Sequence, residues 1–551
     1  MTMPFPSSAN FETLAQALAS SAVACPERPL LQVLPETARL YGIAAGELSY
    51  AQVQHEATRL RQAYAHAGYG HGHRVGLLLE NRPAFILHWM ALNALGVSVV
   101  PINGDMRAAE LEYLIDHSEM LLAVALPSHH EVLRSAARTV GSPLQVMRDD
   151  EVPPTAARPA PLAGQAVSIE TECGLLYTSG TTGRPKGCIL SNRYFLMAGQ
   201  WYADLKGVVN LQPCQERMLT PLPLVHMNAM AFSYTAMLIT GGCLILLDRF
   251  HPGSWWDSVR ESQATVIHYL GVMPAMLMKT AASPGDREHK VRFGFGAGVN
   301  RSLHQPFEER FGFPLVEAWA MTETGAGGVV IAHQEPRLPG TSCFGREDDS
   351  LEVRLVGDDG QDAAVDQPGE LLVRRAGPQP RLGFFSGYLK DEDATREAWT
   401  DGWFHTGDIV QRDAQGQLHF IDRRKNVIRR SGENIAAVEV ESVLLQHPLI
   451  GAAAVAAVPD PVRGDEVMAC VIAPDVAATT EAREAAAADI VQWCLSRLAY
   501  YKAPGYVGFV QALPLTTSQK VQRADLRLLA ASLPGQEACI DTRHLKKRQT
   551  A

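Results

Sequence analysis

One stretch of the chain groups the side chains and backbone that bind phosphate. Residues 177 to 187 read Tyr-Thr-Ser-Gly-Thr-Thr-Gly-Arg-Pro-Lys-Gly, with four serine and threonine hydroxyls, three glycines and one lysine. Glycine lets backbone N–H groups approach an anion, while the hydroxyls and Lys186 add donors and charge. Apolar runs at 173–177 and 188–190 predict that two strands hold the loop. We therefore expect a nucleotide triphosphate to bind Thr178, Ser179, Gly180, Thr181, Thr182, Gly183 and Lys186.

Two other phosphate motifs do not match the sequence. A Walker A loop needs Gly-Lys followed by Ser or Thr, but Lys186 stands between Pro185 and Gly187. The run at 294–298 resembles a dinucleotide fingerprint, but Val299 occupies its third glycine position. Both a P-loop NTPase and a Rossmann dehydrogenase are therefore disfavoured.

Size, charge and cysteine usage limit the class of protein. The 551 residues suggest about three or four folding units at roughly 150 residues each. A net charge of −10 argues against a dedicated nucleic-acid or membrane-surface binder. No apolar run has the length of a membrane span, and the N-terminus lacks the features of a signal peptide, so a cytoplasmic location is expected. The nine cysteines are scattered without a Cys-x-x-Cys pair, which predicts reduced thiols and neither disulfides nor a zinc site.

The hydrophobic pattern predicts an α/β fold. Residues 74–101 read as strand, helix and strand, which implies a parallel, doubly wound sheet. A Pro/Ala-rich stretch at 152–161 separates two subdomains, and short strands with turns between about 340 and 422 suggest a small β-barrel-like unit. Beyond this unit we expect a helix at 438–446, a strand at 452–458 and a helix at 481–498.

Four further segments carry polar residues typical of a catalytic site. They are Glu317-Ala-Trp-Ala-Met-Thr-Glu323, Trp403-Phe-His-Thr-Gly-Asp408, the charged run 422–434, and Pro514-Leu-Thr-Thr-Ser-Gln-Lys520. Together with the loop at 177–187, their order and spacing resemble the adenylate-forming superfamily of acyl-CoA synthetases, luciferases and adenylation domains. The resemblance covers nearly the whole chain. Within the superfamily, residues 422–441 look most like carnitine/crotonobetaine-CoA ligase and fatty-acyl-CoA ligases.

The resemblance implies an ATP site that uses Mg²⁺. Glu323 matches the magnesium ligand, with Thr178 as a second oxygen donor, and a carboxylate suits this hard cation. Thr322 would reach the α-phosphate, and Asp408 would accept the ribose hydroxyls beside Arg423. The adenine would lie between Trp319, which replaces the usual tyrosine, and residues Gly296, Ala297 and Gly298. Glu317 and Ala318 complete the expected nucleotide-binding residues.

The implied reaction has two steps, in which a carboxylic acid attacks ATP and coenzyme A then displaces AMP from the acyl adenylate. Lys520 would offset the repulsion between carboxylate and α-phosphate, with Thr322, Glu323 and Lys186 as the other catalytic residues. Gln519 stands where the family usually has glycine. Arg429, Ser431 and Gly432 match the CoA side of the site, with Arg429 in place of a frequent lysine.

The same resemblance predicts the domain organisation. An N-terminal domain is expected at 1–422, with subdomains at roughly 1–160, 161–338 and 339–422. Residues 423–426 would form a hinge about Lys425, and 427–551 a mobile C-terminal domain.

The acid itself is left open by the sequence. The acyl pocket is expected to include His226, Met227 and Met273. Two other functions compete with an ATP-dependent carboxylic acid:CoA ligase: an enzyme that loads the acid onto a carrier protein, and a catalytically silent ligand-binding relative. The retention of Glu323, Asp408 and Lys520 disfavours the silent relative. A homodimer is one assembly to test.

Overall fold

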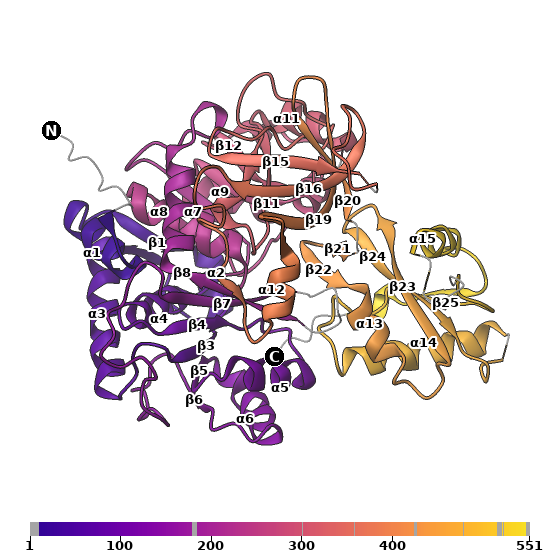
Figure 1. Cartoon of the computed structure of the whole chain (residues 1–551), viewed down its shortest axis with the longest axis horizontal. Coiled ribbons are helices and arrows are strands. Elements are labelled where there is room, and N and C mark those ends of the chain that lie inside the picture. Colours follow the sequence, from indigo (N-terminus) through magenta and orange to yellow (C-terminus); the bar gives the residue numbers. More distant parts are fainter. Residues whose placement is uncertain are drawn as a thin grey trace. The chain divides into compact units, whose positions relative to one another are not determined.

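The chain forms two compact units in a computed structural model that describes residues 10–178, 185–299, 301–357, 359–423, 427–477, 479–514, 521 and 523–546. The first unit comprises Met1–Gly104, Ile115–Leu176 and Gly187–Asp422. The second comprises Arg423–Ala551 together with Asp105–Leu114 and Tyr177–Lys186. The α/β class predicted from the sequence is confirmed, because helices alternate with mainly parallel strands in the first unit (Figure 1).

The largest sheet of the first unit has eight strands in the order β14-β13-β12-β11-β9-β10-β1-β2. Its neighbours are parallel except at the two edges, where β14 and β2 run antiparallel. The strands are β1 (Pro29–Val33), β2 (Gly46–Ser49), β9 (Arg217–Thr220), β10 (Cys243–Leu246), β11 (Val266–Leu270), β12 (Phe293–Ala297), β13 (Leu315–Trp319) and β14 (Val330–Ile331).

Both faces of this sheet are buried, as the alternation along β10 shows. Cys243 and Ile245 pack into one apolar cluster with helices α9 (Trp255–Ser262), α10 (Val272–Met278) and α11 (Arg301–Phe311). Leu244 and Leu246 point to the other face and pack with α1 (Leu14–Ala24), α7 (Asn192–Asp204) and α8 (Thr235–Thr240). A sheet covered on both faces places its ligand groups at the ends of its strands.

A second sheet, of seven strands, has the order β17-β8-β7-β4-β3-β5-β6. The predicted strand–helix–strand unit is confirmed, since β3 and β4 are parallel and α4 (Pro83–Asn93) connects them. Helices α3 (Tyr50–His66), α5 (Ala108–Ser118) and α6 (His130–Thr139) also belong to this region. The strands are β3 (Arg74–Leu78), β4 (Ser98–Pro101), β5 (Leu122–Ala125), β6 (Gln145–Met147), β7 (Glu172–Thr178), β8 (Lys186–Ser191) and β17 (Gly387–Tyr388).

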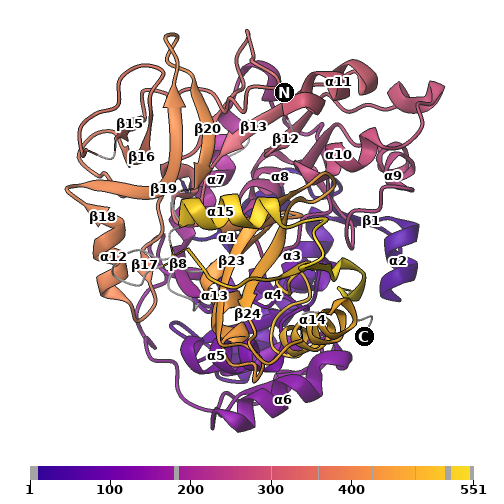
Figure 2. The same ribbon diagram turned by 90° about the vertical axis from the view of Figure 1, so that its right-hand side faces the viewer.

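A third, antiparallel sheet confirms the change of texture expected after residue 340. Its strands β15, β16 and β19 are adjacent, with β18 and β20 beside β19, at the upper left of Figure 2. Helix α12 (Glu392–Ala398) precedes β18. Helix α2 (Pro35–Tyr41) does not belong to this sheet and connects β1 with β2. The strands are β15 (Leu351–Val356), β16 (Pro368–Arg375), β18 (Trp399–Thr400), β19 (Trp403–Arg412) and β20 (Leu418–Arg423).

The C-terminal part of the chain folds around its own six-stranded sheet. Residues of β23 alternate between two apolar clusters, so Ala453 and Val455 pack with α13 and α14, and Ala454 and Ala456 with α15. In Figure 1, α14 and α15 accordingly lie on opposite faces of β23 and β24. The elements are β21 (Val427–Arg430), β22 (Glu433–Ala436), α13 (Ala437–Leu444), β23 (Ala452–Asp460), β24 (Gly464–Ile472), α14 (Thr480–Leu495), β25 (Tyr506–Phe509), α15 (Arg523–Ser532) and β26 (Cys539–Asp541).

Two general features accompany this fold. All nine cysteines are free, and seven of them are buried, as the sequence predicted. Across the described residues, none of the helices has both the length and the apolar character required to cross a membrane.

A buried ion cluster stabilises the C-terminal sheet. Both carboxylate oxygens of Glu466, on β24, lie 2.9 Å from Arg430 Nε, and Lys546 Nζ lies 2.5 Å from Glu466 Oε1. The side chains of Arg430 and Glu466 are 2% and 0% exposed, and that of Lys546 is 0% exposed. Burial, reinforced by the charge of Arg430, lowers the pKa of Lys546 to about 7. Glu466 is therefore the counter-charge of the buried Arg430, and it also accepts a hydrogen bond from Lys546.

Replacing Glu466 by glutamine is expected to destabilise the C-terminal unit by about 3–5 kcal/mol, because the buried Arg430 cation loses its counter-charge. The measurement is native-state hydrogen exchange of β24 amides in the full-length chain. Glu484→Gln, at an exposed position of α14, is the control and should change little. Equal protection in both variants would show that the cluster does not stabilise the sheet.

Candidate active site

Two strand ends of the first unit bring together six of the residues expected to bind a nucleotide. Gly296 and Ala297 end β12, and Glu317, Ala318 and Trp319 end the adjacent parallel strand β13. Gly298 follows β12 with a φ of +78°, a left-handed conformation that suits glycine. Parallel neighbours deliver their carboxyl ends to the same edge, so these segments share one edge of the sheet.

Asp408 joins this group from the antiparallel sheet through a hydrogen bond to Trp319. The indole Nε1–H donates to Asp408 Oδ2 at 2.8 Å, and both side chains are buried. Trp319 also lies beside Phe344, with ring centroids 6.2 Å apart. The residue expected beside the adenine is thus tied directly to the residue expected to hold the ribose.

A β-bulge in β19 determines where Asp408 points. Glu370 pairs with Ile409 and Leu372 with His405, so Leu371 alone faces residues 406 to 408. Gly407 has a φ of +69° within the bulge. The Thr406 hydroxyl donates to Leu371 O at 2.7 Å and accepts the Asp408 N–H at 3.0 Å. Bulges re-aim side chains, and this one turns a buried carboxylate toward Trp319.

Glu323 and Thr322 lie in a tight turn after β13. The Tyr194 hydroxyl donates to Thr322 O at 2.9 Å, and the Phe385 N–H donates to Glu323 O at 2.9 Å. The carboxylate of Glu323, which is 7% exposed, accepts the Tyr388 hydroxyl at 3.0 Å. Burial, together with the charge of Glu323, raises the pKa of Tyr388, so its hydroxyl stays protonated and donates.

This arrangement suits a magnesium ion that also contacts phosphate. Mg²⁺ is bound in proteins through one or two carboxylates plus substrate oxygens, rather than by an all-protein cage. No group of three or more His, Cys, Asp or Glu able to hold a metal occurs among the residues that the structure describes. A single oriented carboxylate, as at Glu323, fits the shared mode.

The hydroxyl-rich loop is only partly described. Thr178 ends β7 and Lys186 begins β8, so the two strands expected to flank the loop are confirmed. Ser179, Gly180, Thr181, Thr182 and Gly183 lie outside the described residues. Strand β8 continues to Cys188, which pairs with Tyr388 of β17, the residue that donates to Glu323. The strand leaving the loop is thereby linked to the Glu323 turn.

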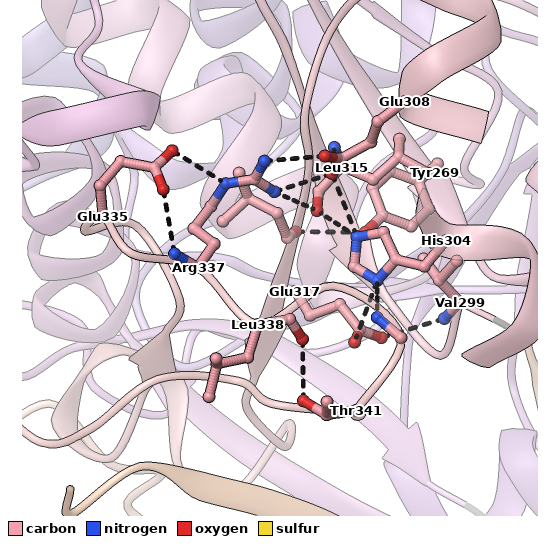
Figure 3. A network of polar contacts seen from close by, with 12 residues as sticks. Tyr269, Val299, His304, Glu308, Leu315, Glu317, Glu335, Arg337, Leu338 and Thr341 are labelled. Atoms are coloured by element: carbon pink, nitrogen blue, oxygen red, sulfur yellow. Dashed lines mark hydrogen bonds and ion pairs between the residues drawn. The ribbon is translucent and has the colours of Figure 1, made fainter. Parts of the chain in front are cut away.

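Glu317 has a role in the structure that its sequence motif did not reveal. Its Oε1 accepts two backbone N–H groups, those of Gly298 at 2.9 Å and Val299 at 3.0 Å. Figure 3 shows the contact with Val299. Its Oε2 lies 4.0 Å from His304 Nδ1. Burial raises the pKa of Glu317. Because the two N–H donors belong to the turn expected beside the adenine, Glu317 fixes that turn.

The residues expected at the acyl pocket lie on different segments of the first unit. His226 and Met227 precede a π-helical segment, η4 (Asn228–Tyr234), and Met273 is buried on α10. Met227 packs against the cluster on one face of the eight-stranded sheet and Met273 in the cluster on the other. A π-helix is rare and frequently marks a functional site.

A polar cluster forms beside η4, and the sequence did not reveal the contacts within it. His268 Nδ1 lies 2.8 Å from both Ser233 Oγ and Asn228 Oδ1, and its Nε2 lies 3.2 Å from the Tyr202 hydroxyl. The ring stacks on Phe295 of β12 at 4.8 Å. Burial lowers the pKa of His268 to about 3, so the imidazole is neutral. The period-3.6 pattern could not identify this cluster, because its members come from four separate elements.

The expected CoA-side residues form a hairpin turn in the second unit. Arg429 pairs with Asn434 one residue before β21 ends, and its N–H donates to Asp465 Oδ2 at 3.1 Å. Ser431 and Gly432 have φ values of +52° and +88°, as in the two-residue turn that best fits a twisted hairpin. Arg423 ends β20. Lys425 and Lys520 lie outside the described residues.

Comparisons with known proteins agree with this arrangement. The AMP-binding enzyme family matches residues 29–389, and the AMP-binding enzyme C-terminal domain matches residues 439–520. The chain is 32% identical over 529 residues to a sulfoacetate–CoA ligase of Cupriavidus necator, covering 94% of this chain and 97% of the relative. It is 28% identical to a crotonobetaine/carnitine–CoA ligase of Salmonella typhi, covering 87% and 93%.

The fold likewise matches a solved structure. The amide bond synthetase McbA of Marinactinospora thermotolerans superimposes with a TM-score of 0.78 at 24% identity, covering 94% of this chain and 99% of the synthetase. The chain belongs to the AMP-binding enzyme family. The resemblance to adenylate-forming enzymes is confirmed, and within them the chain is an acid–thiol ligase of the acyl-CoA ligase branch, which uses ATP, Mg²⁺ and CoA.

Replacing Trp319 by phenylalanine is expected to weaken AMP binding about tenfold. The phenyl ring can still stack, but Asp408 loses a hydrogen bond of the kind that contributes about 1.5–3 kcal/mol when one partner is charged. Calorimetric titration with AMP measures the change. Trp403→Phe is the control, because Trp403 begins the same strand as Asp408 but packs against Arg374. Unchanged affinity in Trp319→Phe would show that the indole N–H does not support the site.

Proposed function

We propose that the enzyme joins a short, polar carboxylic acid to coenzyme A through an acyl adenylate, releasing AMP and pyrophosphate. The nucleotide part rests on the buried hydrogen bond between Trp319 at the end of β13 and Asp408 in the bulge of β19. The turn with Gly298 follows the neighbouring strand β12, and the turn with Glu323 follows β13. The aromatic ring of Trp319, the Asp408 carboxylate suited to ribose hydroxyls and the Glu323 carboxylate suited to Mg²⁺ then lie at one edge of the sheet. That combination fits a nucleotide.

The residues divide the work of the first step. Asp408 accepts the ribose hydroxyls, Trp319 stacks on the base, and Thr322 donates to the α-phosphate. Glu323 supplies the oxygen that would hold Mg²⁺, an ion whose charge, when bound, offsets that of the phosphates. Thr178, Lys186 and the loop between them bind the outer phosphates. Lys520 contacts the acid and the α-phosphate while the carboxylate oxygen bonds to phosphorus and pyrophosphate leaves.

The second step uses the C-terminal domain. We assign residues 423–426, with Lys425, as the hinge and the hairpin turn at Ser431 and Gly432 as the part that faces CoA. The thiol sulfur bonds to the activated carbonyl carbon, and AMP leaves with the bonding electrons. An independent apolar core within residues 427–546 supports this proposal, because a unit that carries its own core can rotate as a body.

The polarity of the acid is inferred from the cluster around His268. Neutral His268 and Ser233 are buried, and Asn228 is half-buried, next to His226 and Met227, the first residues of the expected acyl pocket. A long alkyl chain would leave such polar groups without new partners, whereas a short acid with a second polar group could bond to them. The names of the two curated relatives, which concern sulfoacetate and carnitine or crotonobetaine, agree with a small charged acid.

A screen of acids tests this function directly. Short acids with a sulfonate, ammonium or second carboxylate group should support pyrophosphate release at a kcat/KM about 10- to 100-fold above that of long-chain fatty acids, since a hydrogen bond to a charged group contributes about 1.5–3 kcal/mol. AMP and the acyl-CoA thioester should accumulate in equal amounts. ADP as product would refute the mechanism, preference for fatty acids would refute the acid class, and faster transfer to a carrier protein than to CoA would favour that alternative.

Replacing Lys520 by alanine is expected to separate the two steps. Adenylation should fall at least about 100-fold, since one oriented donor contributes on the order of 3 kcal/mol to the transition state. Thioester formation from added acyl adenylate should stay within about threefold. Pyrophosphate exchange and thioester release measure the two steps, with Lys279→Ala, at an exposed position, as control. Equal loss of both steps would contradict this role for Lys520.

Two further expectations stay predictions. The cytoplasm is where we place the enzyme, because ATP and CoA are both available there. A homodimer can be tested by light scattering of the purified chain at several concentrations.

A further inference from the structure

The turn after β12 is enclosed by its two neighbouring strands. On one side, the Gly271 N–H at the end of β11 donates to Ala297 O at 2.9 Å. A Cβ at Gly271 would lie 1.7 Å from Gly298 O, so the turn rests directly on that glycine. On the other side, Glu317 of β13 accepts the N–H groups of Gly298 and Val299. The backbone from Ala297 to Val299 is therefore fixed by hydrogen bonds from both sides.

Glu317 is in turn held in place by the network drawn in Figure 3. Its strand is fixed at Leu315, whose N–H donates to Glu308 Oε1 at 2.8 Å and whose carbonyl accepts from His304 Nε2 at 2.9 Å. Arg337 binds both oxygens of Glu308, at 2.7 and 2.8 Å. Burial alone would raise the pKa of Glu308, but the hydrogen bonds from Arg337 and His304 lower it to about 2. An ionised, anchored Glu308 keeps β13 and α11 in one register.

His304 closes the network around the second oxygen of Glu317. Its Nδ1 accepts the Gly340 N–H at 3.2 Å and lies 4.0 Å from Glu317 Oε2. Glu317 is 6% exposed and His304 4% exposed. Although burial by itself lowers the pKa of His304, the hydrogen bond to Glu308 and the charge of Glu317 outweigh it and raise the pKa. With the imidazole on one side, the carboxylate of Glu317 has little freedom to turn away from the two N–H groups.

Because Glu317 engages both N–H donors of the turn, the turn can bind only a base that offers a donor of its own. A peptide segment offers a ligand N–H donors and C=O acceptors, and here the N–H groups of residues 298 and 299 are already engaged. A carbonyl oxygen has two lone pairs and can accept again even when one hydrogen bond is made. A base edge lying against this turn therefore meets acceptors and needs a donor, such as the exocyclic amino group of adenine.

We propose that Glu317 determines the adenine specificity of the enzyme by engaging the two backbone donors of the turn at 297–299, so that only acceptors face the six-position of the purine. This rests on the nucleotide site of the proposed function. In this proposal Glu317 acts through the turn rather than by the direct nucleotide contact that its motif implied, which makes it a positioning residue. Hypoxanthine, with a carbonyl oxygen in place of the amino group, is disfavoured because acceptor would face acceptor.

The test compares ATP with inosine triphosphate in pyrophosphate exchange, and AMP with inosine monophosphate in calorimetric binding. Glu317→Met removes the acceptor while keeping a side chain of similar length. The wild type should prefer ATP strongly, and Glu317→Met should lower the ATP to ITP ratio of kcat/KM at least tenfold, because the freed N–H groups can donate to the six-oxo group. Glu317→Gln keeps an acceptor oxygen and should restore most of the preference.

Two controls separate specificity from stability. Glu216→Met removes a carboxylate of similar burial, 1% exposed, before β9 at the opposite end of the same parallel sheet. It should lower the melting temperature without changing the ATP to ITP ratio. Should Glu317→Met fail to fold, Glu317→Asp keeps the charge but shortens the reach to the turn, and the same fall in ratio is expected.

The outcomes distinguish this inference from the proposed function. If Glu317→Met lowers ATP and ITP use by the same factor, or changes neither, the specificity role is wrong. If the wild type binds AMP but exchanges no pyrophosphate with any acid, the proposed reaction is wrong, and the ratio of AMP to IMP affinity still decides the role of Glu317. If the wild type binds no AMP, both are wrong.

Discussion

Three buried carboxylates each need a hydrogen-bond donor inside the first unit, and the donors that they bind determine the geometry of the site. Glu317 accepts two backbone N–H groups, Glu323 accepts the Tyr388 hydroxyl, and Asp408 accepts the indole of Trp319. A buried charge without such partners is costly, so each donor is fixed as firmly as the carboxylate it serves. The turn after β12, the turn after β13 and the bulge in β19 are thereby held at one edge of the sheet.

The substitution of tryptophan for the usual tyrosine acquires a physical meaning in this setting. From the sequence alone, Trp319 stood for an aromatic surface against which a base could stack. In the structure the indole also supplies the donor that Asp408 accepts. In the site that we propose, the residue therefore couples two parts of one nucleotide, its base and its ribose, through a single buried hydrogen bond. A larger ring with a polar edge is compatible with the site because Asp408 lies within its reach.

The second unit follows a different principle. Its sheet is covered on both faces by helices of the same unit, and its charged interior, Arg430, Glu466 and Lys546, is paired within that unit. The hairpin turn at Ser431 and Gly432 takes its left-handed conformation from local backbone geometry. A unit with its own apolar core carries its turn with it, which supports the proposal that this domain serves both half-reactions.

The sequence by itself determined the fold class, the strand–helix–strand unit at 74–101, the strands that flank the hydroxyl-rich loop, and the family. These features depend on local hydrophobic periodicity and on motifs whose residues are close together in the chain. Only the tertiary structure decided that Glu317 binds the turn after β12, that a bulge aims Asp408 at Trp319, and that His268 gathers Ser233 and Asn228. Each of these contacts joins residues from separate elements, tens of residues apart in the chain. Hydrogen bonds across such distances leave no periodic signal, since they exist only after the sheets have packed.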